Sequence, residues 1–465
     1  MNSYKFPDDF MWGIATASYQ IEGATTEAGR KPSVWDTFSQ TPGKVLHGDT
    51  GIIACDHYHH YETDIQLMAQ LGVKHYRFSI AWPRIIPDGR GTVNEAGIDF
   101  YRRLVDCLHQ HNITPHATLF HWDSPEALED LYGSWRSREM AKDFADYVTA
   151  VVSRLGDRIT NWMTINEITC FTHLGYAVNS DPPHAPGTRV DTNKEVWQTS
   201  HHALLAHGLA TQAIRAASPT PCLISLVDNI SVTVPISETP ENIQAAQQAF
   251  HLCGQNGGII FPALTGRYSP ALLEHLGKDA PDIQAGDLEI IHQPLDAVGL
   301  NIYSGTYVQA RDNGSYDYRD RQPSYEFLSF PVGYPKMYMP WLNIIPESLY
   351  WGIRHIGETL GRQDLPLFIT ESGCAAQDEV NAQGKVIDTD RIMYLRQYFK
   401  AAHRAISEGY PLKGYFVWSF MDNFEWSYGY DRRFGLVYID YQNQQRLTKA
   451  SFDWYRECIN QNRVV

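Results

Sequence analysis

Carboxylate, amide, imidazole and indole side chains follow several short apolar runs of this sequence. Glu167 comes at the end of one run, directly after Asn166, and Glu371 comes at the end of another. Comparable positions hold Gln20, Arg77, His121, Trp122, Asn301, Tyr303, Trp418, Glu425 and Trp426. Amides and carboxylates pair with neighbouring hydroxyls, and indole faces cover C–H patches, so these residue types together suit a sugar.

Two carboxyl groups on opposite sides of a sugar pocket have a defined chemistry. One can protonate the leaving oxygen of a glycosidic bond while the other attacks the anomeric carbon. Retaining glycosidases hold these groups about 5–5.5 Å apart, and inverting ones about 6.5–9.5 Å apart. A single glutamate in such a place can equally form a salt bridge or a cap, but the whole set after apolar runs favours a catalytic site.

The apolar runs also predict the elements that must position these side chains. Eight strands are expected, over residues 10–17, 73–80, 113–120, 159–165, 222–227, 297–302, 367–370 and 414–420. Amphipathic segments alternate with them, which implies parallel strands joined by helices. We expect one α/β domain spanning residues 1–465, a (β/α)8 TIM barrel with elaborated loops, whose working residues lie at the C-terminal ends of the strands.

The segments between the predicted strands show helical spacing. One helix is expected to end at Gly72, Asn94 is the predicted N-cap of the next, and Thr389 is the predicted cap of the helix before the last strand. Residues 310–346 lack this periodicity and are too long for an ordinary connection. We expect them to form an elaborated loop that walls the site.

The charge balance limits the classes of partner. The chain carries 38 lysine and arginine residues against 53 aspartate and glutamate residues, a net charge of −15. Nucleic acids and anionic membranes attract positively charged surfaces, so we expect neither as a partner and predict a small neutral or cationic ligand. No apolar run reaches transmembrane length. The oligomeric state stays open.

The cysteines bear on the cellular compartment. The chain has 7 of them, spread singly and without a Cys-x-x-Cys pair. An odd number of scattered cysteines argues against a disulfide framework and predicts free thiols in a reducing compartment. The first residues do not follow the pattern of a secretion signal, so a cytoplasmic protein is expected.

Histidine and glycine clusters do not show the spacing of a metal or phosphate site. Histidines occur within residues 57–60, but no His-Glu-x-x-His motif accompanies them. These residues, like His201, His202 and His207, are expected on solvated helix surfaces. The Gly-x-Gly-x-x-Gly pattern of dinucleotide sites is also absent. We therefore expect neither a metal ion nor a cofactor.

Longer motifs connect these residues to a known family. Thr164-Ile165-Asn166-Glu167 and Ile369-Thr370-Glu371-Ser372-Gly373 resemble the two catalytic signatures of family 1 glycoside hydrolases, the β-glucosidase family. The resemblance covers nearly the whole chain, through residues 10–13, 76–84, 121–123, 422–426 and 433–436.

This resemblance implies roles at the matching positions. Glu167 would be the general acid/base, with Asn166 holding the sugar 2-hydroxyl, and Glu371 would be the nucleophile. Arg77 and Tyr303 would orient Glu371 and keep it ionised, because a nearby guanidinium lowers the pKa of a carboxyl group. A terminal sugar of a small β-glycoside or short oligosaccharide would be bound by Gln20, His121, Trp122, Asn301, Trp418, Glu425, Trp426 and Phe434.

The resemblance is incomplete near the expected pocket. Ile168 stands where the family usually has proline, Ser372 where it usually has asparagine, and Ser124 where leucine is common. None of these changes removes a reacting group, but all three adjoin the pocket and bear on fine specificity and on the balance between hydrolysis and sugar transfer. Trp341, in the predicted loop, is a candidate contact for the leaving group.

Three other functions are weighed against a retaining β-glycosidase. A 6-phospho-β-glycosidase is kept open by Arg432 alone, since Glu425 would repel a phosphate and Phe434 has no donor for one. A non-catalytic sugar-binding barrel would be favoured by loss of either catalytic carboxylate, and both are present. A thioglucosidase-like enzyme does not need an acid at the position of Glu167. Glucose, galactose and fucose stay open as the preferred sugar.

Overall fold

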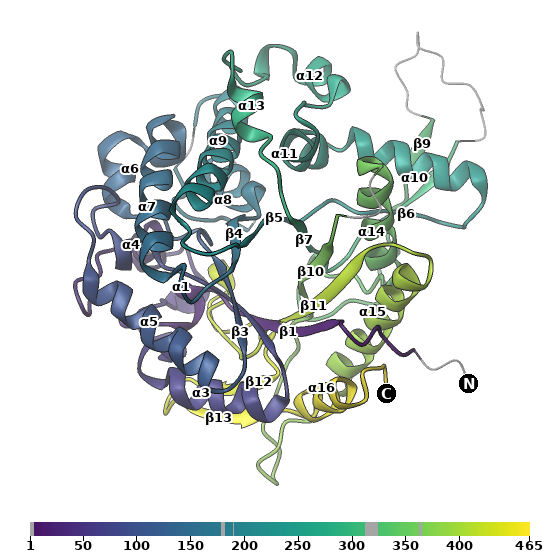
Figure 1. Ribbon diagram of the computed structural model, residues 1–465. Helices are drawn as coiled ribbons and strands as arrows, with labels where there is room; N and C mark the ends of the chain where they lie inside the picture. The colour runs from purple at the N-terminus through teal and green to yellow at the C-terminus, as the bar shows by residue number, and fades with distance from the viewer. Residues whose placement is uncertain (1–3, 178–181, 189, 312–323, 362–364) are drawn as a thin grey trace.

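Eight parallel strands form a closed barrel, which a computed structural model describes for residues 4–177, 182–188, 190–311, 324–361 and 365–465 (Figure 1). The strands are β1 (Met11–Ala15), β2 (His75–Ser79), β3 (Thr114–Thr118), β4 (Asn161–Asn166), β5 (Leu223–Asp228), β7 (Ala297–Asn301), β10 (Leu367–Ser372) and β11 (Leu412–Trp418). They neighbour one another in chain order, and β1 pairs with β11 to close the ring. All eight predicted strands and the predicted (β/α)8 barrel are confirmed.

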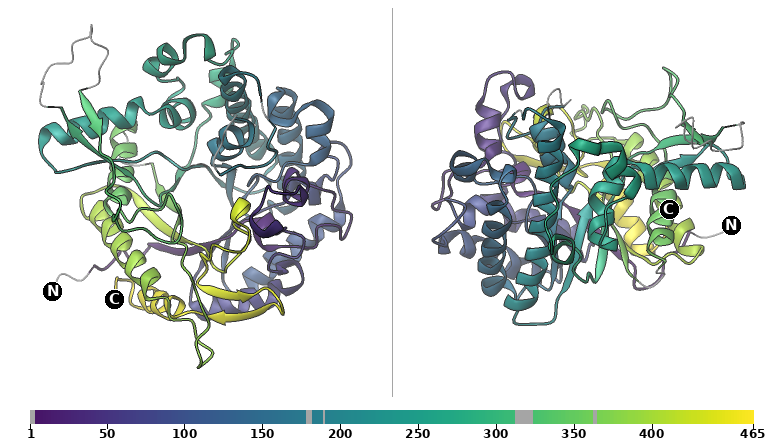
Figure 2. Two further views of the ribbon diagram at one scale, coloured as in Figure 1. Left: turned by 180° about the vertical axis from the view of Figure 1, so that it is seen from behind. Right: turned by 90° about the horizontal axis from the view of Figure 1, so that it is seen from above.

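Helices surround the barrel on the outside, as the views from behind and from above also show (Figure 2). Each strand is buried on both faces, which explains why the strands read as nearly continuous apolar runs in the sequence. The longer helices are α3 (His57–Leu71), α5 (Glu95–Gln110), α7 (Glu139–Leu155), α9 (Asn193–Ala217), α10 (Pro240–Leu252), α14 (Glu347–Leu360), α15 (Thr389–Ser407) and α16 (Ala450–Gln461).

Shorter helices lie in the connections between strands and helices. They are α1 (Ser18–Ile21), α2 (Val34–Gln40), α4 (Trp82–Ile85), α6 (Glu126–Tyr132), α8 (Ile168–Tyr176), α11 (Phe261–Thr265), α12 (Pro270–Leu276) and α13 (Asp287–Ile291). Within the described residues, no helix is both long enough and apolar enough to cross a membrane.

Two small sheets lie outside the barrel. The first joins β6 (Thr233–Pro235), β8 (Thr306–Ala310) and β9 (Tyr325–Phe327), and the second joins β12 (Val437–Asp440) and β13 (Gln445–Thr448). The predicted loop over residues 310–346 therefore contains a strand, because β9 pairs with β8 in a hairpin. Residues 312–323 of that predicted loop lie outside the described residues.

Local predictions at the helix ends are only partly confirmed. Helix α3 ends at Gly72, whose φ of 88° lies in the left-handed region that glycine adopts without strain. Asn94 occupies the N-cap position of α5, but its side chain donates hydrogen bonds to the carbonyls of Ala28 and Arg84 instead of capping. The predicted cap Thr389 is the first helical residue, and the N-cap position belongs to Asp388.

The predicted solvent exposure of several histidines is wrong. His201, His202 and His207 are buried along α9, where His201 contacts Tyr268 and the carboxylate of Asp287. His57 at the start of α3 is buried as well. Each of these side chains has a protein hydrogen-bond partner, which a buried imidazole requires.

Candidate active site

A pocket of about 520 Å³ opens at the carboxyl ends of the barrel strands. Most of the predicted site residues line it, namely His121, Trp122, Glu167, Asn301, Tyr303, Glu371, Trp418, Glu425, Trp426 and Phe434. Gln20, Arg77 and Asn166 are almost completely buried and do not line the pocket surface. Arg77 bonds to Glu371 and Asn166 to Asn301, which both line it. Gln20 bonds to Asn423 and to the carbonyl of Phe424, next to Glu425.

The carboxylate of Glu371 projects from the end of β10 and receives two strong hydrogen-bond donors. Arg77 on β2 places its guanidinium 2.5 Å from Glu371 Oε1, and the Tyr303 hydroxyl donates to Oε2 at 2.8 Å. The same guanidinium donates to the side-chain oxygen of Asn166 at 2.6 Å. Barrel closure brings these residues together from strands that are far apart in the sequence.

Glu167 follows β4 and has a different environment. Its φ of 48° puts a non-glycine residue in the left-handed region, a strained conformation that recurs at functional sites. Asn301 Nδ2 donates to Glu167 Oε1 at 2.6 Å, and the Cys170 thiol lies 3.2 Å from Oε2. No lysine or arginine side chain of the described residues forms an ion pair with this carboxyl group.

These environments set the protonation of the two carboxyl groups. Burial, together with the nearby charge of Glu371, raises the pKa of Glu167 to about 8. Burial also raises the pKa of Glu371, while Arg77 and Tyr303 oppose that rise. Arg77 lowers the pKa of Glu371 as expected, but desolvation is the larger effect, so the net shift is upward. The pair still deprotonates first at Glu371, since only this carboxylate contacts a cation.

Several buried polar atoms near the pocket have no hydrogen-bond partner among the described residues. They include Gln20 Oε1, His121 Nδ1 and Glu425 Oε2. Burial and the charges of Glu371 and Glu167 raise the pKa of Glu425 to about 8. Because buried polar atoms in proteins are normally paired, this set is suited to a ligand that carries several hydroxyl groups.

Aromatic rings form one side of the same pocket. The ring of His121 lies nearly parallel to those of Trp418 and Trp426, with centroids 5.8 Å and 6.1 Å away. Trp122 packs against Trp426 at 4.6 Å. The Phe434 ring meets Tyr303 edge-on at 6.2 Å. These apolar faces beside unpaired polar atoms match the two-sided surface of a sugar ring.

The structure adds pocket residues that the sequence predictions missed. Cys170 is one of them, and its thiol contacts Glu167 in the pocket wall. Asn229 and Gln255 also line the pocket, and they are hydrogen-bonded to each other. Asn229 directly follows β5. The expectation that site residues follow the ends of the strands would therefore have identified it, had it been applied to this strand.

The predicted loop does reach the pocket with its second half. Met339 and Trp341 line the pocket, and the Trp341 ring lies 5.7 Å from that of Tyr303 in an edge-on arrangement. Trp341 remains 43% exposed, so part of its ring faces solvent at the pocket mouth.

Within the described residues there is no group of three or more His, Cys, Asp or Glu side chains that could hold a metal ion.

Comparison with known proteins agrees with this geometry. The family model "Glycosyl hydrolase family 1" matches residues 2–464. The chain is 40% identical to Beta-glucosidase A of Acetivibrio thermocellus over 99% of its own length and 100% of that protein. It is 42% identical to the bifunctional beta-D-glucosidase/beta-D-fucosidase of Bifidobacterium breve, with 98% of each chain covered.

A solved structure with a bound inhibitor is also similar. The beta-glucosidase of Thermotoga maritima in complex with deoxynojirimycin superposes with a TM-score of 0.88 at 40% identity, over 99% of this chain and 100% of that one. Similarity of sequence and structure thus extends from end to end. On the family match and these relatives together, the chain belongs to glycosyl hydrolase family 1.

Proposed function

We propose that the chain, as a single catalytic domain, is a retaining β-glycosidase that releases terminal, non-reducing β-linked sugars, above all glucose. The observation that carries this proposal is the unequal environment of two buried carboxyl groups in one pocket. Glu371 contacts a guanidinium and a phenol, whereas Glu167 contacts an amide and a thiol. One group is thereby suited to carry negative charge and the other to hold a proton.

In the first step, the carboxylate of Glu371 attacks the anomeric carbon and the bond to the leaving oxygen breaks. Glu167 gives its proton to that oxygen, and the sugar becomes ester-linked to Glu371. Ester formation removes the negative charge at Glu371. The pKa of Glu167 then falls, because that charge is one cause of its raised value. Glu167 can now accept a proton from the water that hydrolyses the ester.

The other residues would hold the sugar in place for both steps. Asn166, fixed by Arg77 and close to His121, would bind the 2-hydroxyl. The unpaired atoms of Gln20, His121 and Glu425 would accept or donate hydrogen bonds to further hydroxyls. Trp418, Trp426 and Phe434 would cover the C–H faces of the ring. Trp341 and Met339 lie further out and would contact the leaving group.

The structure weighs against the phosphorylated-sugar alternative. Arg432, the residue that kept it open, forms an ion pair with Asp431 and stacks on the ring of Tyr338 at 3.9 Å. Glu425 in the pocket would repel a phosphate group, and Phe434 offers it no donor. A binding protein without activity is disfavoured because Glu167 and Glu371 are both present and both reach the pocket.

Initial rates on four nitrophenyl glycosides test the proposal. We expect turnover of the β-glucoside, with the β-fucoside and β-galactoside also accepted, and no turnover of the 6-phospho-β-glucoside. The sugar released first should be the β-anomer, which NMR detects directly. An α-anomer would contradict the retaining mechanism, turnover of the phosphorylated substrate alone would favour the alternative, and no turnover would favour a binding protein.

The pH profile of kcat/KM gives a second expected result. The acid must be protonated in the free enzyme, and its pKa is raised to about 8, so kcat/KM should be retained below that pH and fall above it. Asp228 is buried at the end of β5, and its charge is one cause of the raised pKa of Glu167. Asp228→Asn should therefore move the alkaline limb to lower pH. A limb that moves to higher pH in this variant would contradict the assignment of Glu167 as the titrating acid.

We also propose that the enzyme works in the cytoplasm. All cysteines, including the pocket residue Cys170, are free thiols. Free thiols persist in a reducing compartment, whereas exported proteins tend to form disulfides. Fractionation of cells that express the protein at natural levels, followed by activity assays of each fraction, would test this location.

A further inference from the structure

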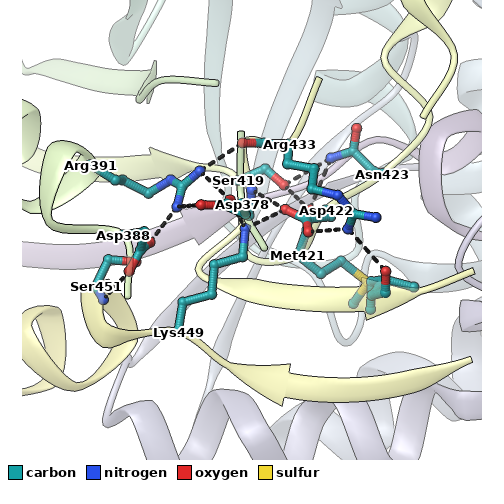
Figure 3. Close-up of polar contacts among 12 residues, drawn as sticks. Asp378, Asp388, Arg391, Ser419, Met421, Asp422, Asn423, Arg433, Lys449 and Ser451 are labelled. Atoms are coloured by element: carbon teal, nitrogen blue, oxygen red, sulfur yellow. Dashed lines mark hydrogen bonds and ion pairs between the residues drawn. The ribbon is translucent and has the colours of Figure 1, made fainter. Parts of the chain in front are cut away.

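A network of buried ion pairs lies beside the segment that follows β11 (Figure 3). We call residues 419–435 the glycone loop, because Glu425, Trp426 and Phe434 within it line the pocket. The network joins six charged side chains from four parts of the chain, Asp378, Asp388, Arg391, Asp422, Arg433 and Lys449.

Lys449 connects the two halves of this network. Its side chain is fully buried just before α16, and its ammonium group lies 2.5 Å from Asp378 Oδ2 and 2.6 Å from Asp422 Oδ1. Asp378 is also paired with Arg391 on α15, at 2.8 Å. Lys449 is therefore the only one of the six charged side chains that is bonded to both of these aspartates.

Asp422 lies near the start of the glycone loop and is hydrogen-bonded to residues at its end. Its Oδ1 accepts the backbone N–H of Gly435 at 2.9 Å, and its Oδ2 accepts the Arg433 guanidinium at 2.7 Å. A side chain at position 435 would collide with backbone atoms of Met421 and Asp422, so the two ends of the loop lie in close contact. Arg391 holds the same end of the loop by donating to the Arg433 carbonyl at 2.7 Å.

Asn423, next to Asp422, connects this network to Gln20, a predicted sugar-binding residue. Asn423 Nδ2 donates to the Ser419 hydroxyl, and Asn423 Oδ1 accepts a hydrogen bond from Gln20 Nε2 at 3.1 Å. Gln20 Nε2 also donates to the carbonyl of Phe424 at 2.9 Å. The position of Gln20 therefore depends on the conformation of residues 423–424, next to Glu425. None of these contacts reaches Glu167 or Glu371.

We propose that Lys449 is a positioning residue for the sugar-binding side of the pocket, which it holds in place through Asp422 and the glycone loop. This inference rests on the proposed function, since it assumes that the glycone loop binds the terminal sugar. Loss of the ammonium group leaves Asp378 and Asp422 as buried carboxylates with one cation fewer between them. Asp422 then lacks the cation that holds its Oδ1 atom in place, so Asp422 shifts, and with it Glu425 and the partners of Gln20.

Lys449→Met tests this role, because it keeps the aliphatic stem and removes the charge. We expect KM for nitrophenyl β-glucoside and Kd for deoxynojirimycin to rise at least about tenfold, which is the loss of one charge-assisted hydrogen bond. The alkaline limb of the kcat/KM profile should not move, since Glu167 is untouched. The value of KM distinguishes a positioning role from a purely stabilising one. A smaller folded fraction lowers the apparent kcat but leaves KM unchanged.

Arg138→Met is the matched control. It removes one cation from the buried Asp287, which keeps His201 as a second partner, just as Asp422 keeps Arg433. The control should lower thermal stability and leave KM unchanged. If Lys449→Met lowers stability and leaves KM within about twofold of the wild type, Lys449 is merely structural and the inference is wrong.

A second variant tests the inference in case Lys449→Met alone folds poorly. Lys449→Met with Asp378→Asn removes one cation and one anion, so the network stays balanced while Asp422 still lacks its ammonium partner. The inference predicts that KM and Kd stay raised, whereas a return of both to wild-type values overturns it. Wild-type enzyme without turnover would contradict the proposed function, and deoxynojirimycin binding would then still decide the role of Lys449.

Discussion

Glu371→Ala is expected to abolish hydrolysis of every β-glycoside, with a fall in kcat/KM of at least about 10⁵-fold. The variant has no group that can form the ester, so neither an activated leaving group nor a change of pH should restore the rate. The side chain lies at the end of β10 in contact with Arg77 and Tyr303, and its removal leaves that guanidinium without its carboxylate partner. Steady-state rates on nitrophenyl and dinitrophenyl β-glucosides measure the loss.

Glu371→Gln is the companion variant, because it keeps the shape and hydrogen-bonding capacity of the side chain without its charge. It should be as inactive as the alanine variant. Melting curves and deoxynojirimycin binding report whether both proteins remain folded with an intact sugar site. Activity of either variant within about tenfold of the wild type would show that another group is the nucleophile.

Glu167→Ala is expected to affect the two chemical steps unequally. Dinitrophenolate leaves without protonation, so kcat/KM for the dinitrophenyl glucoside, which reports the first step, should stay close to that of the wild type. The second step loses its general base, and kcat should fall by about 10²–10⁴-fold. The ester intermediate then accumulates, so KM should fall together with kcat, and a burst of dinitrophenolate should precede the slow steady state.

A poor leaving group provides the internal control for this variant. Cellobiose releases a sugar alkoxide, which needs the proton of Glu167, so its kcat/KM should fall steeply in the same preparation. Azide attacks without a general base and should accelerate the slow second step. Equal losses in both steps, or equal losses on both substrates, would contradict the role of Glu167 as acid/base.

Much of the fold was predictable because its signals are local. A strand that is buried on both faces reads as a continuous apolar run, so the eight barrel strands could be identified without knowledge of their neighbours. Parallel strands bring their carboxyl ends to one face, so the residues that follow them could be assigned to one site. Asn301, Glu371 and Trp418 were found in this way, and they line the same pocket.

Contacts that join distant segments were not predictable in the same way. The side chain of Asn94 bonds to the carbonyls of Ala28 and Arg84, which fold beside it, so its N-cap position did not lead to capping. His201 is buried and not exposed because Tyr268 and Asp287, more than 60 residues further along the chain, fold against it. A residue type and its neighbours in sequence carry no information about such an approach.

The order of the strands, the barrel they form and most of the pocket residues follow from local patterns in the sequence. The electrostatics of the pocket depend on contacts that form only when the chain folds. Burial raises the pKa of Glu371 although Arg77 lowers it, and Lys449 meets Asp422 only in the folded chain. The physical reason is that apolar periodicity depends on residues a few positions apart, whereas desolvation and charge pairing depend on every atom that folding packs around a group.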